Sequence, residues 1–407
     1  MRPILFGTIL LSIAVAYYVH IPLPSNVSEP WTLLFTDAVI RSIMDVSFLA
    51  HDLGLSHPFA FVKYFMSWNE IESAQSSPGV RVTDTSFAGV QARVFGSTLE
   101  GHLKRGVVYF HGGGWTLGSA KMKSYDSQCR RMAEELDAVV ISVEYRLAPE
   151  ARFPDQYNDA LEVSKRILTA EVLDRYSIDP ERVAVSGDSA GGNLAAAVTH
   201  QMALDASAPT KFKVQALLYP VLQSLDFNMP SHQQNRNMPI LNAPLLARLV
   251  LEYFNGSQAL VPSLLANRHL ALNQSQEIAA AKAKINWTRF LPAAVQKNFK
   301  PVVPLQGDPK MVQTLKFMLD VRASPLLAAQ EVLKAVPPTY IMTCELDMLR
   351  DEGLMYGRRL EEAGVAVTID HYEDGFHGCT SFAFSPTPFT VALRSFGNYI
   401  QWLKENL

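Results

Sequence analysis

The segment Val183–Asn193, which reads VAVSGDSAGGN, limits what this chain can fold into more than any other. A short apolar run leads into Gly187-Asp-Ser-Ala-Gly191, the only G-x-S-x-G in the sequence, and a helix-competent run, Leu194 to Met202, follows at once. A serine on a sharp turn between a strand and a helix is exposed, and its neighbours must be small. The segment therefore predicts an α/β fold in which Ser189 acts as a nucleophile.

A second glycine motif lies about 80 residues upstream, where an apolar run ends in His111-Gly-Gly-Gly-Trp115. Consecutive glycines let backbone N–H groups face a small pocket without side-chain obstruction, as an oxyanion hole requires. Together the two motifs indicate ester or amide hydrolysis. We expect Gly112, Gly113 and Ala190 to donate to the oxyanion, and His111 and Gly114 to support the loop.

A serine nucleophile needs a base within hydrogen-bond reach and an acid that orients this base. In the expected chain order the acid and the histidine follow the serine. Of the ten histidines, His371 and His377 follow the late strands. Because His371 reads as part of a strand, whereas His377 lies in a glycine-bounded loop directly after it, we favour His377 as the base.

The catalytic acid is expected just after the preceding strand, which ends near Cys344. Asp347 falls at that point, where a carboxylate can reach an imidazole. Glu345 is a weaker rival, and Asp351 is better suited to brace the following helix. The sequence therefore favours Asp347.

From residue 80 onward strand-like and helix-like runs alternate, which predicts a mostly parallel sheet covered by helices on both sides. The first two strands are expected to form a hairpin. Strands are expected at Val80–Phe87, Gln91–Val94, Val107–Phe110, Ala138–Val143, Val183–Ser186, Gln215–Tyr219, Thr339–Thr343 and Val367–Tyr372.

Two regions outside this alternation read as helical additions. Residues 25–78 form a membrane-proximal cap region with apolar residues at helical spacing. Within the catalytic domain, residues 79–407, a proline-rich stretch of roughly 100 residues at about 222–321 is too long for an ordinary loop. We interpret it as an inserted, largely helical cap.

The N-terminal residues 1–24 contain the uncharged apolar run Ile4–Val19, which just reaches the length of a membrane-spanning helix. Arg2 precedes this run and the next basic residue is Arg41, so the positive-inside rule places the rest of the chain on the lumenal side. A single-pass signal anchor is therefore expected. The alternative is a cleaved signal peptide, because Ala14-Val15-Ala16 resembles a cleavage site.

Glycosylation sequons agree with a lumenal catalytic domain. Asn255, Asn273 and Asn286 each begin an N-x-S/T motif well beyond the apolar run. Asn26 begins a fourth, but it lies close to the expected membrane surface. A single sequon occurs easily by chance, whereas three in one stretch support the topology.

Bulk properties narrow the function classes further. A net charge of −3 without long charge runs argues against nucleic acid as a partner. Three cysteines cannot build a disulfide framework. The sequence has no metal-ligand spacing, and Ser119 follows Gly118 where a phosphate-binding loop requires lysine. We expect no metal, no cofactor and no obligate protein partner.

Five segments carry a resemblance to a known family. They are HGGGW at 111–115, YRLAP at 145–149, GDSAGGN at 187–193, DMLRDE at 347–352 and DGFHG at 374–378. The chain resembles the hormone-sensitive-lipase-like branch of the α/β-hydrolases, and within it the arylacetamide deacetylase group. The resemblance implies an α/β-hydrolase fold and a lumen-facing serine hydrolase of lipid esters in the endoplasmic reticulum membrane. Candidate substrates are cholesteryl esters and acetylated monoalkylglycerol ethers.

The resemblance maps the triad onto Ser189, Asp347 and His377, in agreement with the interpretation from the residues. One departure concerns a disulfide. The deacetylase carries a cysteine directly after the HGGGW tryptophan, paired with the cysteine that matches Cys344. Here that position is Thr116, which removes this pairing.

Two rival functions remain at the level of sequence. The first is an arylacetamide deacetylase-like amidase or xenobiotic esterase that uses the same triad. The second, of a different class, is a catalytically silent lipid-binding module. The intact Ser189, His377 and glycine loop argue against silence, whereas the triad alone does not separate esters from amides.

Overall fold

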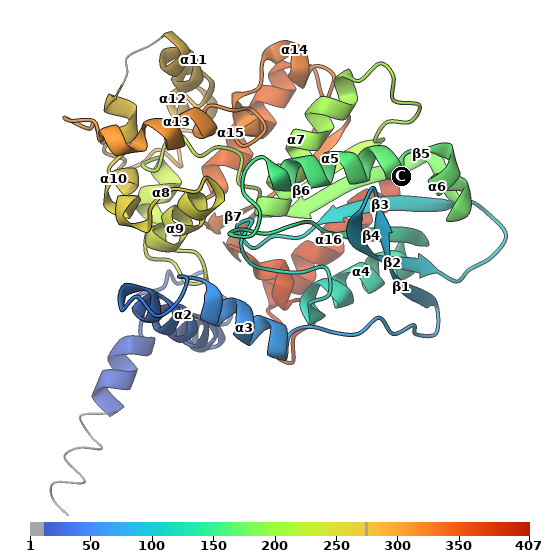
Figure 1. Ribbon diagram of the computed structural model, residues 1–407, viewed down its shortest axis with the longest axis horizontal. Helices are drawn as coiled ribbons and strands as arrows, with labels where there is room; N and C mark the ends of the chain where they lie inside the picture. The colour runs from blue at the N-terminus through green and yellow to red at the C-terminus, as the bar shows by residue number, and fades with distance from the viewer. Residues whose placement is uncertain (1–11, 273–275) are drawn as a thin grey trace, which may run out of the picture.

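The computed structural model describes residues 12–272 and 276–407. All eight expected strands form, and they make one sheet in the order β1-β2-β4-β3-β5-β6-β7-β8 (Figure 1). Most strands are longer than their apolar runs, because polar residues at the ends also join the ladder. The strands are β1 Val80–Phe87, β2 Val90–Ser97, β3 Lys104–Phe110, β4 Ala138–Glu144, β5 Ile178–Asp188, β6 Val214–Leu218, β7 Thr339–Leu346 and β8 Val367–Phe376.

The sheet is mostly parallel, as predicted. β2 pairs antiparallel with β1 and β4, and all five remaining pairs are parallel. The β1–β2 hairpin is confirmed; its turn holds Ala88 and Gly89 at positive φ. Because the carboxyl ends of parallel strands meet at one edge, the segments that follow β3, β5 and β7 converge there.

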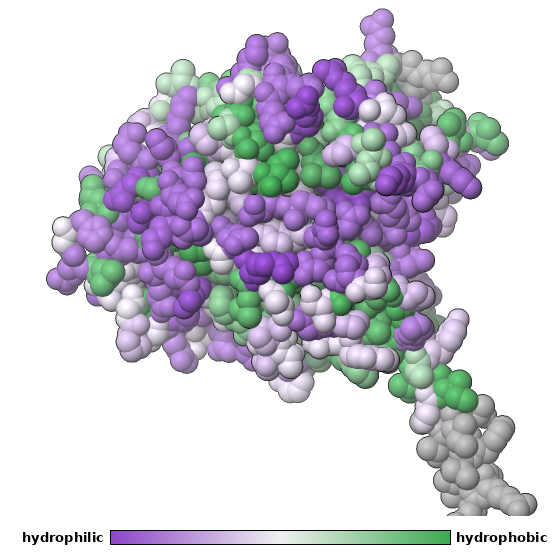
Figure 2. All heavy atoms as spheres, turned by 180° about the vertical axis from the view of Figure 1, so that it is seen from behind, coloured by the Kyte–Doolittle hydropathy of each residue, from purple (hydrophilic) through white to green (hydrophobic). Residues whose placement is uncertain are grey.

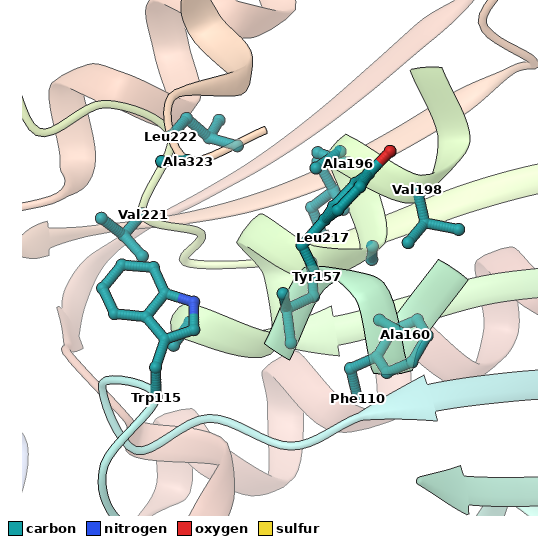
Figure 3. Packing of buried hydrophobic residues seen from close by; sticks show 14 of the residues in the cluster. Phe110, Trp115, Tyr157, Ala160, Ala196, Val198, Leu217, Val221, Leu222 and Ala323 are labelled. Carbon is teal, nitrogen blue, oxygen red and sulfur yellow. The ribbon is translucent and has the colours of Figure 1, made fainter. Parts of the chain in front are cut away.

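Helices cover both faces of the sheet, and the strands alternate between two cores. Val108 and Phe110 of β3 pack into one cluster, while Val107 and Tyr109 pack into the other. Figure 3 shows part of the first cluster, with Phe110 on its strand beside helices of the covering layer. That face carries α5 Asp155–Ile167, α6 Ala170–Arg175, α7 Ala190–Leu204, α14 Gln330–Leu333 and α15 Arg350–Glu362; the opposite face carries α4 Lys123–Glu135 and α16 Thr390–Asn406.

The described part of residues 222–321, between β6 and β7, contains helices and irregular segments but no strand. Buried leucines of these helices join the larger core cluster, so the insertion packs tightly on the catalytic domain. Its elements are α8 Pro230–Gln234, α9 Ala243–Tyr253, α10 Val261–Leu265, α11 Gln276–Lys284, α12 Trp287–Phe290 and α13 Val312–Met318, with short 3-10 turns at Gln258–Leu260, Arg268–Ala271 and Pro309–Met311.

The helices α2 Pro30–Asp52 and α3 Ala60–Asn69 precede the sheet. They lie at the corner of the molecule from which the N-terminal segment leaves, next to the inserted cap (Figure 1). Residues 12–19 are helical, and the first half of the expected membrane anchor lies outside the described residues. No helix in the described ranges is long and apolar enough to cross a membrane.

Candidate active site

Ser189 lies where β5 ends and α7 begins, in a strained backbone conformation. Its φ is 52° and its ψ is −117°, a region that residues with a side chain seldom adopt. The turn is held by two backbone bonds to the segment around β6, from Ser189 N to Leu218 O at 2.9 Å and from Val221 N to Ser189 O at 3.2 Å. The hydroxyl of Ser189 is thereby kept at the carboxyl edge of the sheet.

The glycines around Ser189 are required for space. A Cβ on Gly191 would overlap the carbonyl oxygen of Phe110, and one on Gly187 would lie 2.5 Å from the carbonyl of Gly191. Neither glycine has a positive φ; in this turn the positive φ belongs to Ser189 itself. The structure thus gives a close-packing reason for the small neighbours and leaves the conformational strain on the serine.

The structure brings Ser189, His377 and Asp347 together in one hydrogen-bonded row. His377 Nε2 lies 3.0 Å from Ser189 Oγ, and His377 Nδ1 lies 2.9 Å from Asp347 Oδ2. Because a carboxylate can only accept, Nδ1 carries the proton and Nε2 is free to accept from the serine. Asp347 follows β7 directly and His377 follows β8 directly, so the neighbouring parallel strands β7 and β8 place them side by side.

The residues weighed against this choice have other partners. Glu345 and His371 pair with each other at 3.2 Å, and Glu345 also accepts from Arg350 at 2.6 Å. Asp351 is fully buried and accepts from the backbone N–H of Ser231 at 2.7 Å, which ties α15 to the cap helix α8. Among the described residues, neither Glu345 nor Asp351 forms a hydrogen bond with His377.

The HGGGW loop departs from the expectation at one position. The N–H of Gly112 already donates to Asp188 Oδ1 and to the Tyr125 hydroxyl, each at 2.9 Å. This N–H is therefore engaged below the site, and the prediction of Gly112 as an oxyanion donor does not fit the geometry. The sequence could not show this, because the acceptor, Asp188, comes from a different segment.

Free donors remain at three other positions. Across residues 12–272 and 276–407, no acceptor is found for the N–H groups of Gly113 and Gly114. Ala190 is the first residue of α7, where an amide has no partner within its own helix. Both glycines have positive φ, and a Cβ on Gly113 would overlap the carbonyl of Leu117. The loop thus exposes its amides without side chains.

Asp188 connects the two glycine motifs. Its buried carboxylate accepts from the hydroxyls of Tyr109 and Tyr125 at 3.0 Å each, as well as from Gly112. Burial raises the pKa of Asp188 above its usual range, and these hydrogen bonds oppose the rise. The middle residue of the G-D-S motif is thus a structural anchor that holds the HGGGW loop beside Ser189.

His111 supports the loop through its ring and backbone. It is fully buried, stacks on Tyr145 at 4.4 Å, and its carbonyl accepts from the Tyr145 hydroxyl at 2.7 Å. Trp115 stacks on Tyr253 of α9 at 4.1 Å, which joins the loop to the cap. Through these contacts the loop is attached to Tyr145 and to the cap.

Three further residues position the site and were not identified from the sequence. The ring of Tyr219 lies edge-on against His377, with centroids 5.1 Å apart. Asn235 of the cap donates to the carbonyl of Asp347 at 2.9 Å. Asn193 of α7 donates to Val221 O at 2.9 Å. Asn193 ends the GDSAGGN motif. A polar residue in an otherwise apolar and glycine-rich segment after the nucleophile turn was therefore the signal in the sequence that could have identified it.

Two buried ionisable groups lie beneath the catalytic acid. Glu352 accepts from the backbone N–H groups of Leu222 and Gln223 at 2.6 and 3.1 Å, and burial raises its pKa to about 8. His232 Nε2 lies 3.7 Å from Glu352 Oε1, and burial lowers the pKa of His232 to about 3. These contacts fix the start of the cap to α15.

In the described ranges no cluster of His, Cys, Asp and Glu could hold a metal ion.

Comparison with known proteins places this site in a family. The sequence profile of the alpha/beta hydrolase fold matches residues 107–286 and 309–381. The chain belongs to the α/β-hydrolase family. It is 52% identical over 400 residues to neutral cholesterol ester hydrolase 1 of Mus musculus, covering 98% of each chain, and 42% identical over 393 residues to arylacetamide deacetylase of Oryctolagus cuniculus, covering 96% of each.

Solved structures agree at the level of the fold and of the enzyme class. An esterase from Pyrobaculum calidifontis superposes with a TM-score of 0.59 at 26% identity, covering 90% of this chain and 92% of that one. The mouse relative is a cholesterol ester hydrolase and the archaeal structure is an esterase, and the chain is a carboxylic ester hydrolase.

The cysteines differ from the family arrangement described above. Thr116 Oγ1 donates to Gly114 O at 3.1 Å, so that position braces the glycine loop. Cys344 lies 3.9 Å, sulfur to sulfur, from Cys379, which follows His377 by two residues. Both cysteines are buried and form no disulfide, as is also true of Cys129.

Two of the three predicted glycosylation residues, Asn255 and Asn286, are exposed on the inserted cap. Asn286 also caps α12 from the position before it, where its side chain accepts from Thr288 N at 3.1 Å. Asn273 lies outside the described residues.

Proposed function

We propose that the chain hydrolyses carboxylic esters of lipids through an acyl-enzyme formed on Ser189. The observation that carries the proposal is the continuous row of hydrogen bonds from Ser189 through His377 to Asp347. The similarity to neutral cholesterol ester hydrolase 1 over 98% of the chain supports cholesteryl esters as substrates. Acetyl monoalkylglycerol ethers are the second candidate class.

The geometry supports a two-step mechanism. Ser189 Oγ attacks the ester carbonyl carbon as His377 Nε2 takes its proton, and Asp347 stabilises the resulting imidazolium. His377 then protonates the departing alcohol, which leaves the acyl group on Ser189. Water, deprotonated by His377, releases the carboxylic acid and restores the serine.

The oxyanion of each tetrahedral intermediate is bound by backbone N–H groups of Gly113, Gly114 and Ala190. Gly114 takes the place first expected for Gly112, whose N–H is occupied by Asp188. A single such donor contributes about 2.7–4 kcal/mol of transition-state stabilisation.

The enzyme is further proposed to be a single-pass protein of the endoplasmic reticulum membrane with its catalytic domain in the lumen. The apolar run Ile4–Val19, preceded by Arg2, supports this topology. Glycans on Asn255, Asn273 and Asn286 would follow from it. We expect endoglycosidase treatment to increase the gel mobility of the protein from eukaryotic cells, and alkaline carbonate to leave it in the membrane. Extraction by carbonate would favour a cleaved signal peptide.

The experiment that tests the catalytic proposal is hydrolysis of a matched panel by the purified enzyme. The panel contains cholesteryl oleate, an acetyl monoalkylglycerol ether, a short nitrophenyl ester and an aryl acetamide, each with Ser189→Ala as the blank. We expect both lipid esters to be hydrolysed faster than the acetamide. Preferential cleavage of the acetamide would instead support the amidase, which the similarity to arylacetamide deacetylase makes the second candidate.

A further inference from the structure

The helices α2 and α3 carry large apolar side chains that are mostly exposed to solvent. On α2 these side chains recur at helical spacing along one stripe, and α3 continues them. Trp31, Phe35 and Trp68 are 67%, 58% and 76% exposed. We name as the α2–α3 face the six residues Trp31, Phe35, Val39, Leu49, Tyr64 and Trp68.

This stripe is additional to the one that holds α2 on the protein. The inner side of α2 buries Leu33, Leu34 and Met44 against the core. A helix that needs one apolar stripe for packing gains nothing in water from a second one on its outer side. The outer stripe therefore indicates an apolar partner.

The charges around the α2–α3 face indicate what kind of partner this is. The basic side chains of residues 12–71 are Arg41 and Lys63, and both turn back onto the protein. Arg41 pairs with Asp37 at 2.9 Å, and Lys63 pairs with Glu150 at 2.8 Å. Neither Lys nor Arg of α2 and α3 is thus free to bind nucleic acid or anionic headgroups. Its tryptophans and tyrosine are the residues enriched at the boundary of a lipid bilayer.

The expected membrane tether leaves the protein beside this face. Tyr18, at the end of the N-terminal helical segment, donates to Asp45 Oδ2 of α2 at 2.9 Å, and Arg41 lies over its ring at 4.5 Å. In Figure 2, hydrophobic atoms lie on the body just above the point where the N-terminal residues leave it. A bilayer that holds the tether would therefore meet the α2–α3 face first.

The inner side of α2 reaches the segments that flank the catalytic histidine. Asp37 accepts from the N–H of Ile240 at 2.9 Å, and the Ile240 side chain lies 3.9 Å from the Cβ position of Gly378, which follows His377. Ser28, which lies just before α2, donates to Asp374 at 3.2 Å, and Asp374 belongs to β8, the strand that leads into His377. The site and the α2–α3 face thus share one helix.

We propose that the α2–α3 face inserts into the apolar boundary of a zwitterionic lipid bilayer, in addition to the tether, and holds the site at the membrane surface where a lipid ester is dissolved. The docking itself is independent of which ester is cleaved, whereas the delivery of substrate rests on the function proposed above.

Tryptophan fluorescence of the full chain in phosphatidylcholine nanodiscs tests the docking. Two of the five tryptophans, Trp31 and Trp68, lie on the face. We expect lipids brominated on the acyl chain to quench part of the emission, equally at low salt and in 0.5 M NaCl. The quenched part should be missing in the double variant Trp31→Phe/Trp68→Phe and retained in the control Trp287→Phe/Trp402→Phe. Equal quenching in both variants overturns the proposal. The proposal is also overturned if the emission of the unmodified protein is not quenched and the α2–α3 face instead binds a second copy of the chain.

The rate of ester hydrolysis by the enzyme in the same nanodiscs tests the delivery of substrate. The triple variant Trp31→Ser/Phe35→Ser/Trp68→Ser should hydrolyse a bilayer-dissolved cholesteryl ester several-fold more slowly, with its rate on a soluble short nitrophenyl ester unchanged. The matched control Leu99→Ser/Leu103→Ser/Leu204→Ser removes exposed apolar side chains elsewhere and should keep both rates. An unchanged bilayer rate in the first variant would overturn the delivery while leaving the esterase function intact. Loss of the soluble ester rate would contradict the separation of face and site.

Discussion

At the Ser189 turn nearly every atom is surrounded by protein, whereas on the outer side of α2 large apolar side chains stand in solvent. In the turn, a single methyl group on Gly191 would overlap the backbone of Phe110. On α2, Trp31 and Phe35 are more than half exposed, and the ring contact given for them joins them to each other, at 6.5 Å between centroids. The residues of the turn are determined by packing within the protein. The outer apolar residues of α2 are instead explained by the bilayer proposed as their partner. Substitutions in the two regions should therefore fail in different ways.

The largest effect is expected at the acid of the triad. Asp347→Asn should lower kcat by about 10⁴-fold, because an amide orients the wrong tautomer of His377. Asp351→Asn, four residues further on, should act through stability, because its carboxylate bonds to Arg350 and Ser231. Steady-state rates per folded molecule separate the two. A larger loss for Asp351 would mean that the wrong carboxylate has been assigned.

The next largest effect is expected at the nucleophile turn. Gly191→Ala should destabilise the fold by about 3 kcal/mol, because the added methyl group meets backbone that cannot move aside. Gly397→Ala in α16 is the matched control, because a Cβ there meets nothing within 4 Å. It should stabilise the protein by up to about 1 kcal/mol through helix propensity. Thermal unfolding of both variants measures the difference, and similar melting temperatures would show that the turn is less constrained than described.

Neighbouring residues on α2 allow the comparison within one helix. Leu34 is 4% exposed and packs inward, so Leu34→Ala should cost about 2–5 kcal/mol. Phe35→Ala should change the stability of the detergent-solubilised protein by less than about 0.5 kcal/mol. Chemical denaturation of the two variants checks this. A comparable loss for Phe35 would show that the outer stripe is part of the fold.

A smaller effect, visible only in acid, is expected beneath the cap. His232 is held neutral because burial lowers its pKa to about 3, whereas in the unfolded chain it titrates near 6.5. Its lowered pKa contributes stability that is present above about pH 6.5 and lost as the pH falls toward 3. At pH 5 this loss amounts to about 2 kcal/mol. The His232→Leu variant should therefore lose less unfolding free energy than the unmodified protein when the pH is lowered from about 6.5 to 5. Parallel curves of unfolding free energy against pH for the two proteins would contradict this.

The features that could be predicted from the sequence are those that depend on residues close together in the chain. The eight strands, the hairpin and the placement of Ser189 at a strand-to-helix turn follow from apolar runs and glycines that act within a few residues. Asp347 and His377 were also assigned from position alone, because parallel strands bring successive carboxyl ends to one edge. The engagement of Gly112 could not be predicted, because it depends on Asp188 and Tyr125, which only the folded sheet brings to it.

The outer stripe of α2 shows a different limit of sequence analysis. The helical spacing of apolar residues in 25–78 was recognised, but periodicity does not say which stripe faces the protein. The burial of Leu34 and the exposure of Phe35 distinguish the two stripes. Likewise, the pairing of Glu345 with His371 removed two rivals that spacing alone had left open.

The most direct test of the account is active-site labelling of the full chain with a fluorophosphonate. We predict that the probe attaches to Ser189, as mapped by peptide mass spectrometry, and that Ser189→Ala neither labels nor hydrolyses ester while its circular dichroism is unchanged. His371→Ala, which alters a histidine outside the triad, should label like the unmodified enzyme. Attachment at another serine, or substantial ester hydrolysis by folded Ser189→Ala, would contradict the assignment of this turn as the catalytic centre.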